Sequence, residues 1–154
     1  MKTLIVYDSV FGNTKNVALA MEESLKENGE AAAVHVGKFH LGLLEGVGVL
    51  VVGSPTRGFK PTKEIAGFLD KIPAGRLGGM KVMAFDTRSD VKKIDNKILN
   101  FMVKRFGYAA EPIGDKLVKK GGKLAKSPEG FIVSDTEGPM VDGEIERAKN
   151  WIKL

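Results

Sequence analysis

Between residues 7 and 14 the chain reads Tyr7-Asp8-Ser9-Val10-Phe11-Gly12-Asn13-Thr14. The run Leu4-Ile5-Val6-Tyr7 that leads into this stretch is short and continuously apolar, which is typical of a parallel strand buried on both faces. After it, apolar residues recur at helical spacing until Asn28-Gly29, which predicts a helix over 14–28. The stretch therefore predicts a turn from a buried strand into a helix.

The side chains of this turn favour phosphate binding. Ser9 and Thr14 offer hydroxyl groups, Asn13 offers an amide, and Gly12 lets the backbone come close to a ligand. The N–H groups of the first helical turn have no partner within the helix and point at the same place. The turn lacks the glycine-lysine pair of a nucleotide-triphosphate loop and the three-glycine dinucleotide fingerprint. A neutral cradle of this kind suits one terminal phosphate monoester, and an ordinary capped turn is the alternative.

The turn resembles the FMN-phosphate loop of flavodoxins, and the resemblance extends along the rest of the chain. Residues 53–59 follow an apolar run, where flavodoxins place their first flavin-ring loop, and residues 85–88 follow another, where they place the second. Residues 131–133 and 137–148 are similar to the last strand and final helix of the family. The resemblance implies an FMN site formed by Ser9, Val10, Phe11, Gly12, Asn13, Thr14, Pro55, Thr56, Arg57, Gly58, Phe59, Asp86, Thr87 and Arg88.

This sequence also departs from the flavodoxin pattern. Phe11 stands where the family usually carries a hydroxyl residue, so we expect the loss of one phosphate hydrogen bond and roughly ten- to a hundredfold weaker FMN binding. Arg57 falls where an aromatic commonly stacks on the flavin, so Phe59 or the guanidinium itself would take that role. The resemblance implies that the Gly58 backbone faces the flavin N5 edge. It further implies that the pyrimidine edge is contacted by Asp86, Thr87 and Arg88.

The tyrosine that usually covers the outer flavin face in flavodoxins has no counterpart near these loops in the sequence. We therefore expect a more exposed flavin, or one covered by an additional element.

The order of apolar runs and helical patterns predicts an α/β fold. Strands are expected at about 2–7, 31–36, 47–52, 80–85 and 123–133, the last interrupted at 127–130, and a helix is expected to begin near Pro61-Thr62 and end before Pro73. This alternation indicates one domain over 1–154, built as a doubly wound five-stranded parallel sheet. The resemblance implies the strand order 2-1-3-4-5 with FMN at the switch point.

Between Arg88 and Gly121 the chain holds more than one crossover helix requires. An apolar stripe at helical spacing predicts an amphipathic helix over about 90–108, with the members Val91, Ile94, Ile98, Phe101 and Met102. A second helix is expected over 109–120. We interpret one as the crossover and the other as an insertion after the second flavin loop, with one long kinked helix as the alternative. The stripe would pack over that loop in a monomer or against its copy in a homodimer.

Charge is distributed unevenly along the sequence. Residues 88–126 carry eleven basic and four acidic side chains, a net +7, although the whole chain carries only +5. A solvated face is the simplest interpretation of such a run. The alternative that bears on function is a Lys-rich surface where acidic redox partner proteins dock. Nucleic acid is not an expected partner.

The composition excludes other kinds of site. The chain has no cysteine, and no apolar run approaches the roughly 20 residues of a membrane span. Strand 1 starts at once, which leaves no room for a signal peptide, so a cytoplasmic location is expected. The two histidines form no metal-ligand pattern, so no metal site is expected. His35 is interpreted as packed in a strand, whereas His40, beside Phe39, has a minor claim to a substrate-side role.

The function indicated by the resemblance is electron transfer by an FMN-binding protein of the flavodoxin type. No acid, base or nucleophile has a convincing partner in the sequence, so no catalytic residue is assigned. The alternative is a flavin-dependent reductase or oxidase acting on a quinone- or porphyrin-like substrate. A third possibility is a binding or regulatory module that has kept the fold and lost the flavin.

Overall fold

The computed structural model describes residues 1–89, 97–98, 101 and 107–154. Its centre is a six-stranded parallel sheet with the order β2-β1-β3-β4-β5, in which β6 also pairs with β4. The strands are β1 (Lys2–Tyr7), β2 (Glu30–His35), β3 (Val47–Pro55), β4 (Lys81–Ser89), β5 (Lys123–Leu124) and β6 (Glu129–Val133). The predicted fold class and strand order are therefore confirmed.

The short strands β5 and β6 share the fifth position of the sheet. β5 pairs with Lys81 and Val82 at the amino end of β4, whereas β6 pairs with residues 85–89 at its carboxyl end. Between them the Ala125 N–H still donates to the Val82 carbonyl at 3.0 Å. The interruption predicted at 127–130 is present but lies earlier, at 126–128, where Pro128 cannot donate to a ladder. Glu129 and Gly130 already belong to β6.

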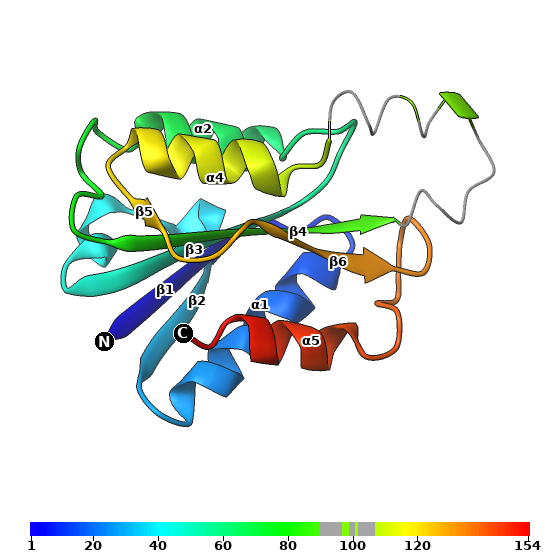
Figure 1. Cartoon of the computed structure of the whole chain (residues 1–154), viewed down its shortest axis with the longest axis horizontal. Helices are drawn as coiled ribbons and strands as arrows, with labels where there is room; N and C mark the ends of the chain where they lie inside the picture. The colour runs from blue at the N-terminus through cyan, green and yellow to red at the C-terminus, as the bar shows by residue number, and fades with distance from the viewer. Residues whose placement is uncertain (90–96, 99–100, 102–106) are drawn as a thin grey trace.

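Helices cover both faces of the sheet (Figure 1). One face carries α1 (Asn13–Lys26) and α5 (Glu144–Trp151), and the other carries α2 (Lys63–Lys71) and α4 (Ala110–Lys119). Alternate residues of each strand enter different cores, so Leu4 and Val6 pack on the α2/α4 side while Ile5 packs on the α1/α5 side. Burial on both faces explains why the central strands read as unbroken apolar runs.

Helix α2 illustrates how local sequence sets an element. Its N-cap residue Thr62 accepts a hydrogen bond from the Ile65 N–H at 3.3 Å. Ile65, Phe68 and Leu69 form the buried face. The helix ends before Pro73, as predicted, because a residue preceding proline disfavours the helical conformation.

Two strands extend further than the apolar runs indicate. β3 continues to Pro55 and β4 to Ser89, because Pro55 pairs with Thr87 and the last five residues of β4 also pair with β6. Parts of both predicted flavin loops are thus the carboxyl ends of strands. After β2, two short 3₁₀ helices, η1 (Val36–Lys38) and η2 (Leu41–Leu44), lead to β3.

The second helix predicted after the second flavin loop is α4. Most of the amphipathic helix predicted over 90–108, including Val91, Ile94 and Met102 of its stripe, lies outside the described residues. The two described members of the stripe, Ile98 and Phe101, are 73% and 67% exposed in the single chain.

Candidate functional site

The carboxyl ends of β1, β3 and β4 bring the three predicted loops together around one small cavity. Its volume is about 70 Å³. It is lined by Ser9, Val10, Phe11, Asn13, Thr14, Pro55, Thr56, Arg57, Thr87, Arg88, Ser89, Val133 and Thr136. Ten of these lining residues are among the predicted site residues. The other predicted residues, Gly12, Gly58, Phe59 and Asp86, do not line the cavity.

The turn between β1 and α1 forms a cradle whose backbone N–H groups bind a hydrogen-bond acceptor. The Ser9 hydroxyl oxygen accepts hydrogen bonds from the N–H groups of Gly12 at 3.0 Å and Lys15 at 3.3 Å. Gly12 has φ +94°, a conformation that a side chain would strain, and no atom lies within 4 Å of where its Cβ would be. Two N–H groups at the start of α1 thus converge on an oxygen beside open space, which is the geometry of an anion site.

Thr14 connects this cradle to the end of β4. Its hydroxyl lies 2.8 Å from the hydroxyl of Thr87, and both residues are buried. The carbonyl oxygen of Thr87 accepts the Thr56 N–H at 3.0 Å, and the Thr56 hydroxyl accepts the Ala109 N–H at 3.0 Å. The three predicted loops are therefore held to one another by hydrogen bonds.

The loop between β6 and α5 closes a further side of the cavity. The Asn13 amide donates to the carbonyl oxygen of Glu137 at 3.1 Å. A Cβ on Gly138 would lie 2.4 Å from the Asn13 amide oxygen, so only glycine fits there. Val133 and Thr136 line the cavity from this side. The sequence interpretation did not include them, although their position just after the last strand was a usable signal.

Asp86 points away from the cavity. Alternation along β4 directs the Asp86 carboxylate to the α4 side of the sheet, where it is fully buried. There it accepts two hydrogen bonds from the Arg88 guanidinium, at 2.7 and 2.8 Å, and a third from the Ala110 N–H at 2.9 Å. Burial raises the pKa of Asp86, and the hydrogen bonds and charge of Arg88 oppose that rise. The side chain thus orients Arg88 and the start of α4.

Arg88 is enclosed on several sides. Its guanidinium lies 3.6 Å from the ring centroid of Tyr108. On another side it passes Gly130 of β6, where a Cβ would lie 2.0 Å from the Arg88 Nε. A tyrosine, Tyr108, thus lies beside the second flavin loop, although it follows that loop at a distance in the sequence. Because this contact forms only in the folded chain, the sequence pattern around the two flavin loops does not indicate it.

The first flavin loop folds back on itself. Arg57 and Lys60 exchange backbone hydrogen bonds of 2.8 and 3.1 Å, and the two residues between them have positive φ, +54° for Gly58 and +69° for Phe59. Two positive φ angles in a two-residue turn are the pattern of type I′, and a non-glycine residue is rare in that region. The Arg57 guanidinium lies 5.8 Å from the ring centroid of Phe11. A cation and an aromatic side chain therefore face each other at the edge of the cavity.

Behind the cradle, Asp8 contacts the end of β2. One carboxylate oxygen of Asp8 accepts the Ser9 N–H at 2.8 Å and lies 3.2 Å from the His35 Nε2. The His35 Nδ1 accepts the Gly37 N–H at 3.0 Å, so in the neutral imidazole Nε2 carries the proton and donates to Asp8. His35 is thus a packed strand residue that also braces the cradle.

Several of the described basic residues in the segment 88–126 lie away from this cavity. Lys123 pairs with the amino end of β4, and Lys116 forms an ion pair of 2.9 Å with Asp70. Lys126 donates to the backbone carbonyl of Trp151. These cations lie at the opposite end of the sheet or contact the carboxyl-terminal residues. Of the lysines at 92, 93, 97 and 104, only Lys97 is described, and it is exposed.

No protein-family model matches the sequence, and no curated protein matches it. Solved structures do. Flavodoxin 2 from Bacillus cereus, in its oxidised form, superposes with a TM-score of 0.76 at 21% identity, over 99% of this chain and 95% of the other. A flavodoxin from the domain Archaea gives a TM-score of 0.72 at 19% identity, over 99% and 94%. The chain has the flavodoxin fold.

The flavodoxin fold also occurs in larger proteins. Rubredoxin oxygen:oxidoreductase from Desulfovibrio gigas gives a TM-score of 0.75 at 18% identity, with 98% of this chain matching 34% of that one. Within the described part of this chain, no helix has the length and apolarity needed to cross a bilayer. The described residues also contain no group of three or more histidine, aspartate or glutamate side chains placed to hold a metal ion.

Proposed function

We propose that this chain binds one FMN at the cavity between β1, β3 and β4 and transfers electrons to and from redox partner proteins. The observation that carries the proposal is the cradle at the start of α1, where two backbone N–H groups already hold an oxygen atom. The flavodoxin fold places this cradle at the edge where doubly wound sheets bind their ligands.

The residues present fit the phosphate of FMN. A phosphate oxygen can accept the N–H groups that now donate to the Ser9 hydroxyl, and Ser9 and Thr14 can donate their hydroxyl protons to it. The space beside Gly12 would be filled by a Cβ in any other residue. The positive end of the α1 dipole adds to the attraction of the anion.

The flavin ring needs more room than the cavity now has, because ligand pockets commonly enclose about 300–1,000 Å³. The flavin ring would therefore lie at the mouth of the cavity, against Phe11 and Arg57. The contact between these two side chains would then be replaced by a contact with the ring. Bound FMN would supply the redox chemistry. The chain's own residues would bind the phosphate, orient the ring and limit the access of water.

The test compares FMN with riboflavin, which lacks the phosphate. We expect Ser9→Ala combined with Thr14→Val to weaken FMN binding at least about tenfold and to leave riboflavin binding nearly unchanged. Quenching of flavin fluorescence gives both dissociation constants. Ser24→Ala is the matched control, since the Ser24 hydroxyl donates to the Lys149 carbonyl at 3.0 Å, far from the cavity.

Equal losses for the two ligands would refute the phosphate assignment, and failure of the unmodified chain to bind FMN would refute the proposed function. The same preparation separates a carrier from an enzyme. A carrier loaded with FMN keeps its absorbance when NADPH is added without a partner, whereas a reductase is bleached.

For the partner, we propose that the basic residues following β4 attract an acidic redox protein. The variant Lys92→Glu, Lys93→Glu, Lys97→Glu should slow reduction of FMN-loaded protein by a reductase extract, and the effect should shrink as salt rises. Lys119→Glu with Lys123→Glu is the control with charges at the other end of the sheet. A rate unaffected by either the charge reversal or the salt would eliminate this docking surface.

A further inference from the structure

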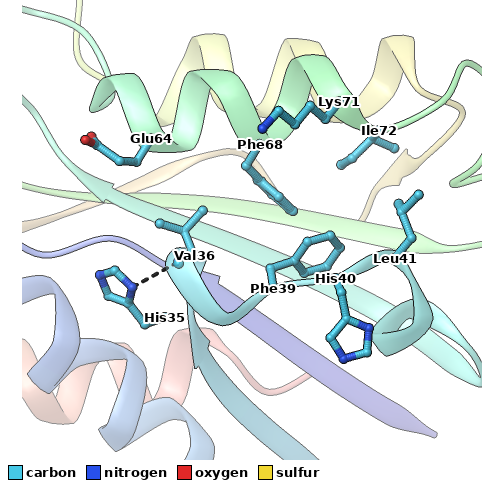
Figure 2. A pocket seen from close by; sticks show the side chains of 10 residues that line it. His35, Val36, Phe39, His40, Leu41, Glu64, Phe68, Lys71 and Ile72 are labelled. Atoms are coloured by element: carbon cyan, nitrogen blue, oxygen red, sulfur yellow. Dashed lines mark hydrogen bonds between the residues drawn. The ribbon is translucent and has the colours of Figure 1, made fainter.

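A second and larger cavity lies between helix α2 and the segment that follows β2. Its volume is about 440 Å³, compared with about 70 Å³ at the proposed FMN cavity. Figure 2 shows apolar side chains from the two walls, among them Phe39 and Phe68, directed toward one another. The size falls in the range of small-molecule sites, which commonly measure about 300–1,000 Å³.

The floor of this cavity is aromatic and aliphatic. The rings of Phe39 and Phe68 meet edge to face with centroids 4.7 Å apart. Phe68 and Ile72 belong to the core beneath and are only 6% and 1% exposed, so the surface that they contribute is small and held rigidly, while Leu41 at the rim is 45% exposed. A flat apolar ring placed here would contact aromatic edges without displacing any packed side chain.

Polar groups stand only at the rim of the cavity. Glu64 and Lys71 lie at opposite ends of α2, about 10 Å apart along its axis. Figure 2 shows the Lys71 side chain extended back along the helix beside Phe68, with the Glu64 carboxylate directed away from both rings. Among the residues that the structure describes, neither of these charged groups forms an ion pair. Lys71 is therefore the charged group beside the apolar floor, and the Glu64 carboxylate lies farther along the rim.

The opposite wall adds two imidazoles. His35 and His40 each precede a glycine by two residues, and a Cβ on Gly37 or Gly42 would lie 3.1 Å from the respective Nδ1. These glycines leave space for the rings against the backbone. Both ring nitrogens of His35 are already engaged, Nδ1 by the Gly37 N–H and Nε2 by Asp8, so His35 offers no donor to a ligand. The preference of the cavity for an anionic group therefore rests on Lys71.

We propose that this cavity binds a small aromatic carboxylate of two or three fused rings. The rings would lie against Phe39 and Phe68, and the carboxylate would lie at the ammonium group of Lys71. This site is separate from the FMN site, and the proposal stands whether or not the chain binds FMN.

The test titrates the full-length protein, first without and then with FMN, using naphthalene-2-carboxylate followed by backbone amide NMR. We expect saturable binding with a Kd of about 1 mM or tighter. The amide shifts should be concentrated at residues 35–41 and 68–72. The uncharged naphthalene-2-carboxamide should bind about two- to fivefold more weakly, the size expected for an exposed charge contact.

Lys71→Met should abolish that preference for the carboxylate, and Lys71→Glu should reverse it. Lys63→Met removes an exposed lysine from the first turn of the same helix, outside the cavity, and should leave the preference intact. The proposal is overturned by absence of saturable binding, by shifts centred on the cradle at residues 9–14, or by equal affinity for the carboxylate and the amide. Because the readout needs no flavin, its failure is distinct from failure of the proposed function.

Discussion

At the scale of single residues, the pair Asp86 and Arg88 is the most tightly constrained feature of the site. The carboxylate is fully buried, and its three hydrogen bonds come from Arg88 and the first residue of α4. A buried charge that loses its partner is costly, whereas the intact pair adds little by itself. The main effect of the pair is therefore to fix the positions of Arg88 and α4, and its contribution to net stability is small.

We predict that Arg88→Met lowers the free energy of unfolding by about 3 kcal/mol at pH 7, because it leaves the Asp86 carboxylate without its cation. Urea unfolding followed by circular dichroism measures this. Arg57→Met is the matched control: it loses only an exposed contact with Phe11 and should cost no more than about 1 kcal/mol.

The deficit of Arg88→Met should also depend on pH. Burial raises the pKa of Asp86, and removal of Arg88 takes away the main opposing influence, so the pKa rises further. A carboxyl with a raised folded-state pKa stabilises the fold fully below its unfolded pKa, about 3.9, and loses that stability as pH rises through the folded value. The difference from wild type should thus shrink from pH 7 toward pH 4. A constant difference would mean that Asp86 stays ionised without Arg88.

At the scale of elements, helix α5 protects the edge strand β6. The Glu144 carboxylate accepts the Ile132 N–H at 2.8 Å, and the Arg147 guanidinium donates to the Gly130 carbonyl. Arg147 also pairs with Glu144 at 2.7 Å and lies over the Phe131 ring. Backbone groups that an edge strand would otherwise offer to another chain are satisfied by an ion pair.

We predict that Glu144→Ala makes the Ile132 amide exchange with deuterium about five- to tenfold faster, since it loses a hydrogen bond worth about 1 kcal/mol. Amide-resolved hydrogen exchange by NMR measures the change. Glu146→Ala, two residues further along the same helix and paired only weakly with Lys149 at 3.8 Å, should leave the exchange of the Ile132 amide unchanged. Similar acceleration in both variants would mean that α5 frays as a whole.

The Glu144 interaction also has a defined pH window. Arg147 and the Ile132 N–H lower the pKa of Glu144, so its stabilising contribution is present above the unfolded pKa, about 4.3, and is lost as pH falls through the folded value. Acidification should therefore lower the protection factor of the Ile132 amide, its intrinsic exchange rate at the same pH divided by the observed rate, in the wild type and have little effect on it in Glu144→Ala.

The same elements show what the sequence could and could not predict. The central strands were predictable because burial on both faces leaves unbroken apolar runs, and the cradle was predictable because Gly12, Ser9 and Thr14 are local to one turn. The Asp86 side chain was expected at the pyrimidine edge of the flavin. Its direction toward α4 could not be predicted, because it depends on how far β4 extends, and pairing with β6 sets that length. The contact of Tyr108 with Arg88 joins segments that only the folded sheet brings together.

At the scale of the whole molecule, ligand binding should appear as a gain in stability. FMN present at about one hundred times its Kd should add about 2.7 kcal/mol, which corresponds to a rise in Tm of roughly 5–10 °C for a chain of this size. Differential scanning fluorimetry measures this rise in Tm, provided that no added dye emits where flavin does. Riboflavin at the same concentration should give a smaller rise, because it cannot use the cradle. A larger rise with riboflavin would contradict phosphate binding.

The strand order has a consequence for how the chain folds. β1 pairs with β2, which follows it closely, and also with β3, which begins at Val47 after two further elements. During synthesis the unit β1-α1-β2 is complete while the backbone edge of β1 that later pairs with β3 still has no neighbour. That edge belongs to an apolar strand, and its unpaired N–H and C=O groups are open to a second nascent chain until β3 emerges. Slow translation between residues 36 and 55 would therefore be the most hazardous interval for this protein, and a chaperone that shields β1 would help most there.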